Sequence, residues 1–332
     1  MNQNIVINGL SKLGLLLREK ESSLSKMIRN KIFLQNAWFS NHSINFCLNH
    51  WSSQLRNENI IDWISKYDIN NKSKNILLIT ASNIPLVGLH DFLCILLTGN
   101  IAVIKPSSRN NILLTWLLDK LCEVEPKICK HILYVKNLND KIVDGVIASG
   151  SNNTSLYLNY IFSNNKRLIR NNRKSIAIIN GNEDEKELKR LADDIFIYYG
   201  LGCRNVSQLF LPANFNLERL QNCFSHYKHI MLNEKYSNNY NYYKTIFEIK
   251  GIAHVDCKFY LLVNSNRLNA PPSVLNFSYY NDIKQVDRFV KENQNNIQCI
   301  VSKSYLNFGL AQRPKLSSYM DNVDTIDFIN KI

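Results

Sequence analysis

Short apolar runs of strand length alternate with helical segments in the middle of the chain, and this alternation constrains the fold most strongly. Helices are expected to begin at Leu86, Asn111 and Thr154. The apolar runs cover residues 76–79, 101–104, 132–135, 145–147 and 176–179. Uninterrupted apolar strands that alternate with helices predict a parallel sheet covered on both faces. Ligands of such sheets bind at the carboxyl ends of the strands.

Two packed domains are expected, because the chain has 332 residues and single cores rarely grow beyond about 250–300 residues. Residues 1–74 are predicted to be a helical segment that belongs to the first domain. Residues 75–181 contain the alternating strands and helices. Residues 182–332 continue with a charged amphipathic helix over 183–199 and strands over 206–211 and 298–302. They form a second α/β domain with a C-terminal tail, and the boundary is placed near 179–183.

The formal charge of +13 would suit a nucleic-acid-binding protein, but its distribution does not. Basic residues are spread along the chain and form neither a tail nor a stripe, and no nucleic-acid-binding motif is present. We therefore expect no nucleic-acid partner. A basic field still attracts polyanionic small molecules, which include nucleotide cofactors and coenzyme A.

The eight cysteines include no C-x-x-C pair and no clustered spacing with histidine, so no metal site is expected. Buried free thiols in a reducing compartment are the expected state of all of them except Cys203. No secretory signal is evident, and the longest apolar stretch, 84–97, is interrupted by His90 and Asp91 and is too short to span a bilayer. The sequence predicts a cytoplasmic protein.

The segments after the strands carry the polar and small residues that bind ligands in this kind of sheet. Lys105 directly follows the second apolar run, and a lysine there can bind ribose hydroxyls or phosphate. Gly150 and its neighbours follow the fourth run, where small residues at a helix start expose backbone N–H groups to a pyrophosphate. Each loop alone is an ordinary β–α connection. Their order, followed by Gly200-Leu201-Gly202-Cys203, indicates a cofactor-dependent enzyme with Cys203 as its nucleophile.

Four segments together resemble the aldehyde dehydrogenase superfamily. They are 82–86 (its Trp-Asn-Phe-Pro-Leu loop), 99–108 (its Gly-Asn-(x)4-Lys-Pro-Ser/Ala-Glu segment), 148–151 (its Phe-Thr-Gly-Ser turn) and 200–203 (its Gly-Gln-x-Cys nucleophile). More closely, residues 83–91, 150–154 and 200–207 are similar to the acyl-CoA reductase family, which includes the reductase subunit of the bacterial luminescence fatty acid reductase. The resemblance implies an α/β fold of two doubly wound domains, with 75–181 binding a nicotinamide nucleotide and 182–332 performing thioester chemistry.

The resemblance also implies roles for individual residues. Cys203 is the thiolate that accepts the acyl group, and Asn83 forms the oxyanion hole together with the backbone N–H of Cys203. We expect Arg204 and a helix that begins at Cys203 to favour the thiolate anion. The cofactor-binding residues are Lys105 at the adenosine ribose, Pro106 and Ser108 in the same segment, and Ser149, Gly150 and Ser151 against the pyrophosphate.

Arg170 is the most informative departure from the superfamily pattern. Oxidative members use the glutamate of a Glu-Leu-Gly-Gly-Lys-Ser run to activate the hydrolytic water, and the matching run here begins with Arg170. An acyl-enzyme without a general base beside it hydrolyses slowly and survives for reduction. The departure therefore favours thioester chemistry over the oxidation of aldehydes to acids.

Two further departures concern the cofactor. Ser108 stands where relatives that use NAD often carry a glutamate, and a serine can donate to a 2′-phosphate that a carboxylate would repel. NADPH is therefore expected in preference to NADH. At the superfamily's Glu-x-Phe-Gly-Pro segment, which holds the nicotinamide ribose, residues 270–273 supply no carboxylate.

The predicted function is NADPH-dependent reduction of a fatty acyl-CoA to the aldehyde through an acyl-cysteine intermediate. An acyl-phosphate reductase of the glutamyl phosphate type is one alternative, since it shares the fold and the nucleophile. A non-catalytic descendant that binds acyl chains or acts as a scaffold is another. The resemblance implies an acyl-CoA or acyl-protein donor and an acyl-protein synthetase as partner, with no integral membrane segment.

Overall fold

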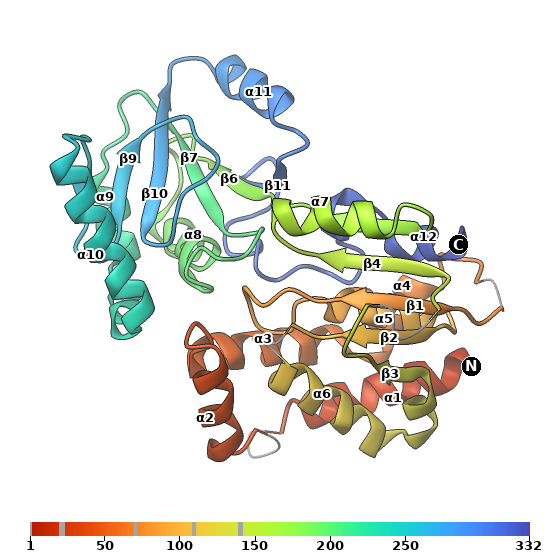
Figure 1. The fold of residues 1–332 in the computed structure, drawn as a ribbon. Coiled ribbons are helices and arrows are strands. Elements are labelled where there is room, and N and C mark those ends of the chain that lie inside the picture. The colour runs from red at the N-terminus through yellow and green to blue at the C-terminus, as the bar shows by residue number, and fades with distance from the viewer. Residues whose placement is uncertain (1, 20–23, 70–71, 108–110, 139–141) are drawn as a thin grey trace. The chain divides into compact units, whose positions relative to one another are not determined.

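The computed structural model describes all residues except 1, 20–23, 70–71, 108–110 and 139–141, and the chain divides into two compact units (Figure 1). The first unit comprises Met1–Asn172 and Lys315–Ile332, and the second comprises Arg173–Pro314. The sequence placed the boundary near 179–183 and assigned the tail to the second domain. The division lies earlier because strand β6 (Lys174–Ile178) pairs within the sheet of the second unit. The C-terminal tail returns to the first unit.

The first unit contains a five-stranded parallel sheet. Its strands, in spatial order, are β3 (Ile132–Tyr134), β2 (Ile101–Lys105), β1 (Asn75–Ile79), β4 (Gly145–Ser149) and β5 (Lys166–Arg170). Four of these strands coincide with predicted apolar runs, and β5 was not predicted. The strand order changes direction between β1 and β4, which places the ligand crevice of such a sheet at the carboxyl ends of these strands.

Both faces of this sheet are covered, as the uninterrupted apolar strands predict. Leu77, Val103 and Val146 pack on one face against Leu158 and Phe162, which belong to α7 (Asn152–Ile161) and its C-terminal cap. Helix α5 (Leu89–Leu97) contacts β1 and β2, and every residue of this helix except His90 is buried. Each buried side chain of this size contributes roughly 1.5–3 kcal/mol relative to an exposed one.

The remaining elements of the first unit are helical. The N-terminal helices predicted for residues 1–74 are present. Together with the later ones they are α1 (Gln3–Leu16), α2 (Lys26–Gln35), α3 (Asn41–Gln54), α4 (Asn57–Ile64), α6 (Asn111–Val124), the 3-10 segments η1 (Pro126–His131) and η3 (Met320–Asn322), and α12 (Thr325–Asn330). None of the helices in the described part of the chain has the length and apolarity to cross a bilayer.

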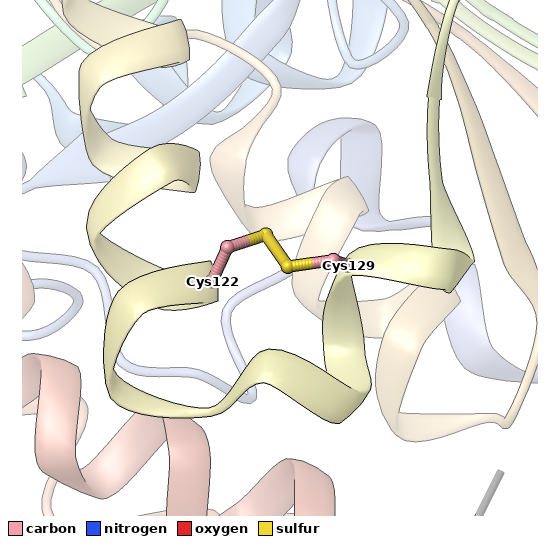
Figure 2. The surroundings of a disulfide bond; sticks show 2 residues. All are labelled: Cys122 and Cys129. Atoms are coloured by element: carbon pink, nitrogen blue, oxygen red, sulfur yellow. A yellow bond between two sulfur atoms is a disulfide. The ribbon is translucent and has the colours of Figure 1, made fainter.

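One disulfide contradicts the expectation that these cysteines are free. Cys122 in the last turn of α6 is bonded to Cys129 in η1 (Figure 2). The chain turns sharply between the two helical segments, so the Cα atoms lie 5.3 Å apart, within the range that a disulfide spans. The other six cysteines are not disulfide-bonded.

The second unit is built on a six-stranded sheet. Its strands, in spatial order, are β11 (Ile297–Val301), β6, β7 (Val206–Pro212), β10 (Val274–Tyr280), β9 (Leu261–Asn264) and β8 (Val255–Asp256), and only β8 is antiparallel to its neighbour. Its helical segments are α8 (Glu185–Phe196), α9 (Glu218–Phe224), η2 (Ser225–Leu232), α10 (Glu234–Ile249) and α11 (Ile283–Glu292). One cluster joins Val286 of α11 to Ile176 and Phe210 of the sheet, and a separate one joins Tyr240 of α10 to Leu261 and Val274.

Candidate active site

Cys203 lies in the loop that connects α8 to β7. After α8 the chain reverses at Tyr199 and Gly200, whose φ angles are 57° and 77°, both in the left-handed region that favours glycine. Residues 203 and 204 then form a turn that leads into β7 at Val206. The expectation that a helix begins at Cys203 is therefore wrong, and no helix dipole stabilises a thiolate there.

Asn205 fixes the shape of this loop. Its side chain is fully buried and accepts a hydrogen bond from the backbone N–H of Gly202 at 2.8 Å. The same amide donates to the carbonyl of Ile195 at 2.9 Å and to that of Asp194 at 3.2 Å. The last carbonyls of a helix have no partner within the helix, so Asn205 satisfies them and ties the loop to α8. Asn205 has no role among the residues predicted from the sequence, and its position directly after Cys203-Arg204 is the signal that could have identified it.

Asp194 ties α8 to the backbone of residues 309–311. Its carboxylate accepts hydrogen bonds from the backbone N–H of Gly309 at 2.6 Å and of Ala311 at 2.8 Å. Burial raises the pKa of Asp194 to about 7, although these two donors favour the charged form. The carboxyl group therefore titrates near neutral pH, in the helix to which Asn205 ties the Cys203 loop.

Ser175 holds the backbone of Cys203 itself. Its fully buried hydroxyl donates to the Cys203 carbonyl at 3.0 Å, accepts from the N–H of Cys299 at 3.2 Å, and lies 3.1 Å from the Cys299 sulfur. Burial raises the pKa of the Cys299 thiol to about 11, so this thiol stays neutral near pH 7. Among the six cysteines outside the disulfide, four are buried, and Cys203 and Cys299 are partly buried. Cys203 is therefore the thiol best placed to react.

Asn83 lies in the first unit, in an exposed bend after β1. The loop around it is held by the Asn36 amide, which donates to the Ser82 carbonyl at 2.9 Å, and by the Cys47 thiol, which lies 3.5 Å from the Pro85 carbonyl. Gly88 ends the loop with a φ of 87°, and α5 begins after it rather than at Leu86 as expected. The exposed Asn83 thus lies in a loop whose flanks are fixed.

The predicted cofactor residues gather at one edge of the first sheet. Ile79 of β1 pairs with Lys105 of β2 on one side and with Ala148 of β4 on the other. Lys105 and Ser149 therefore end strands that flank β1, about 10 Å apart across the sheet. Pro106 follows at the surface, half-buried. Ser108, the predicted determinant of NADPH preference, lies outside the described residues.

Gly150 and Ser151 form the tight entry into α7. A Cβ atom at Gly150 would lie 2.7 Å from the Thr154 methyl group, so only glycine fits there. Ser151 is the N-cap of α7 and accepts from the backbone N–H of Thr154 at 3.3 Å. A glycine before a capped helix start lets a phosphate group approach the backbone closely.

Arg170 is committed to a buried ion pair. Its guanidinium donates to the Asp91 carboxylate at 2.6 Å, to the Thr325 hydroxyl at 2.8 Å and to the Met320 carbonyl at 2.7 Å. Arg170 and Asp91 are 3% and 0% exposed. Burial alone would lower the pKa of Arg170, but the charge and hydrogen bond of Asp91 outweigh it and the pKa is raised. Arg170 therefore has a structural role, and position 170 supplies no general base.

No metal centre is apparent: nowhere among the described residues do three or more His, Cys, Asp or Glu side chains meet as metal ligands would.

Solved aldehyde dehydrogenases share this fold. An aldehyde dehydrogenase from Physcomitrella patens, in complex with the reaction product succinate, is 15% identical, with a TM-score of 0.65 over 91% of this chain and 74% of its own. An indole-3-acetaldehyde dehydrogenase mutant from P. syringae, in complex with NAD+ and IAA, is 12% identical, with a TM-score of 0.64 over 91% and 72%. At such low identity the likeness shows the fold alone, and it confirms the predicted aldehyde-dehydrogenase-like α/β architecture.

The sequence itself matches a known family. The family model "Acyl-CoA reductase (LuxC)" matches residues 53–261, which is more than half of the chain and includes the segments around Asn83, Lys105, Gly150 and Cys203. None of the curated proteins matches the sequence. The chain therefore belongs to the acyl-CoA reductase family and is an oxidoreductase of the kind that forms aldehydes by reducing acyl groups.

Proposed function

We propose that this protein reduces a fatty acyl-CoA thioester to the aldehyde, with NADPH as the reductant and Cys203 as the covalent nucleophile. The observation that carries the proposal is the construction of the Cys203 loop. Its backbone is fixed by Ser175 and Asn205, and its thiol is only half-buried. In a member of the acyl-CoA reductase family, such a thiol is suited to accept an acyl group from coenzyme A.

In the first half-reaction, the Cys203 thiolate attacks the thioester carbonyl carbon. The carbonyl oxygen becomes an oxyanion, and we propose that the Asn83 amide and the Cys203 backbone N–H donate to it. When the carbonyl re-forms, the bond to the coenzyme A sulfur breaks. Coenzyme A leaves as a thiolate that takes up a proton, and the acyl group remains on Cys203.

This acyl-enzyme persists if no general base activates a water molecule beside it. Hydrolysis would require a base to activate water. Position 170, which carries that base in oxidative relatives, holds an arginine whose guanidinium is bonded to Asp91. We propose that the acyl group therefore waits for reduction rather than being lost to water.

The residues at the strand ends fit a nicotinamide nucleotide. Gly150 stands directly before the capped start of α7, where backbone N–H groups suit a pyrophosphate. Lys105 at the end of β2 would hold the adenosine ribose, next to Pro106, while Ser149 and Ser151 would flank the pyrophosphate. When bound, the reduced nicotinamide supplies the hydride that brings the acyl carbon to the aldehyde level. Collapse of the resulting thiohemiacetal releases the aldehyde and regenerates the Cys203 thiolate.

Two finer parts of the proposal rest on the sequence alone. The preference for NADPH rests on Ser108, and a Ser108→Glu variant is expected to shift the ratio of kcat/KM for NADPH over NADH towards NADH. Equal kcat/KM of the wild type for the two cofactors would overturn this part. An acyl-protein synthetase as the partner that delivers acyl groups is proposed from the family resemblance.

The experiment that tests the proposal compares acyl donors. Purified protein is incubated with NADPH and either a long-chain acyl-CoA or an acyl phosphate, and the aldehyde is trapped with a hydrazine and quantified. We expect aldehyde from acyl-CoA, and none from a Cys203→Ser variant. Faster turnover of the acyl phosphate would support an acyl-phosphate reductase instead. A folded wild-type protein that forms no aldehyde from either donor would support a non-catalytic protein.

A further inference from the structure

Lys174 reaches the nucleophile loop from the neighbouring strand. It is the first residue of β6, and its backbone N–H donates to the Asn296 carbonyl at 2.9 Å. Its ammonium group donates to the Gly200 carbonyl at 3.3 Å. Gly200 is the residue whose positive φ turns the chain towards Cys203, so this contact restrains the loop at its start.

No carboxylate neutralises this ammonium group within the part of the chain that the structure describes. Lys174 is half-buried, and its one hydrogen-bond acceptor is a neutral backbone carbonyl. A lysine in such a place usually has an anionic partner, because a desolvated charge is costly. Cys203 follows Gly200 by three residues in the same loop, so a Cys203 thiolate is the candidate anion for this ammonium group.

The titration of Lys174 agrees with this geometry. Burial lowers the pKa of Lys174, and a negative charge on Cys203 raises it. An interaction between two charges is mutual, so whatever the Cys203 thiolate contributes to the ammonium group, the ammonium group contributes to the thiolate.

We propose that Lys174 is a positioning residue for Cys203: it restrains the loop through the Gly200 carbonyl, and its positive charge stabilises the nucleophilic thiolate. This deepens the proposed function, since it assigns to β6 the anion-stabilising role that a helix start at Cys203 would otherwise have performed. Three other titratable groups face this region. Arg204 adds a second cation from the loop itself, Cys299 on β11 is a neutral thiol, and Asp194 on α8 is an acid bonded to backbone N–H groups.

The test measures the pH dependence of Cys203 alkylation in the full chain. Iodoacetamide is used as the probe, and the second-order rate constant is determined from pH 5 to pH 10 by quantifying the peptide that contains Cys203. We expect Lys174→Met to raise the pH midpoint by about 1 unit and to lower the rate at neutral pH about tenfold. Lys174→Arg keeps the charge and should retain most of the wild-type midpoint.

Two controls keep the result interpretable. Lys284→Met removes an exposed lysine of α11 from the same unit and should leave the midpoint unchanged. If Lys174→Met does not fold, Lys174→Gln keeps a donor towards Gly200, lacks the charge, and should show the same upward shift.

A midpoint in either uncharged variant equal to that of the wild type would overturn the proposal. So would a shift of the same size in Lys174→Arg and Lys174→Met, because it would show that the charge is irrelevant. Alkylation requires neither acyl-CoA nor nucleotide. If the wild type forms no aldehyde but the midpoint shifts in Lys174→Met, the proposed function fails while the role of Lys174 stands. If the wild type forms aldehyde but the midpoint does not shift, the role of Lys174 fails while the proposed function stands.

Discussion

Substitution of Arg170 by methionine removes the guanidinium group but keeps much of the volume of the side chain. The Asp91 carboxylate, which is 0% exposed, is then left in the interior without its ion-pair partner. Breaking a buried ion pair by removing one partner costs about 3–5 kcal/mol. The Thr325 hydroxyl and the Met320 carbonyl also lose their donors, and both belong to the C-terminal segment that returns to the first unit.

Urea unfolding followed by tryptophan fluorescence measures this loss directly. All four tryptophans (Trp38, Trp51, Trp63 and Trp116) belong to the first unit, so the signal reports on the unit that contains the ion pair. With an m value of about 2 kcal/mol per molar, the midpoint should fall by about 1.5–2.5 M. As a matched control, Arg56→Met removes an exposed ion pair with Glu58 and should change stability by less than about 1 kcal/mol.

The double variant Asp91→Leu/Arg170→Met distinguishes an unpaired charge from lost packing. It leaves no charge in the interior, so it should be more stable than Arg170→Met alone. If Arg170→Met shifts the midpoint no more than Arg56→Met does, the assignment of Arg170 as a buried structural cation is wrong.

Three further predictions concern Asn83, Asp194 and the disulfide. Asn83→Ala should lower kcat about 10²–10³-fold yet still allow acylation of Cys203, and an unchanged kcat would remove Asn83 from the oxyanion hole. Burial raises the pKa of Asp194 to about 7, so between about pH 4 and pH 7 the folded state binds a proton that the unfolded state has released. The resulting contribution to the free energy of unfolding is complete below about pH 4 and is lost as the pH rises through 7. Calorimetry should show a decline of up to about 1.4 kcal/mol per pH unit that flattens in Asp194→Ala; equal slopes would contradict it. Unfolded, unreduced protein should titrate six thiols because Cys122 and Cys129 are bonded, and eight would refute the disulfide.

The elements that the sequence predicts best are those with one dominant local signal. Strands β1, β2, β3 and β4 are uninterrupted apolar runs, and apolar runs of that length have few alternatives next to helices. Strand β5 escapes this signal because Lys166, Arg167 and Arg170 supply three cations in five residues. Such a strand is tolerated at the edge of a sheet, where it pairs on one side only.

The features that the sequence does not predict depend on contacts between distant residues. The C-terminal segment is held to the first unit by the contacts among Arg170, Asp91 and Thr325. Asp91 is 79 positions from Arg170 and 234 positions from Thr325 in the sequence. The residues of the Cys203 motif lie in a loop in which Cys203 is only partly buried. The Asn205 amide holds that loop as a turn, so the local preference for a helix after Cys203 is overridden. The sequence does not show that Ser175 and Lys174 contact the loop that carries Cys203.

The most direct test of the central claim is the intact mass of the protein after incubation with a long-chain acyl-CoA in the absence of cofactor. We expect a covalent acyl adduct on the wild type, located on Cys203 by peptide mapping and absent from Cys203→Ser. Addition of NADPH should remove the adduct and release the aldehyde in equal amount. A folded wild-type protein that gains no adduct, or an adduct that persists in Cys203→Ser, would contradict the assignment of Cys203 as the acyl-accepting nucleophile.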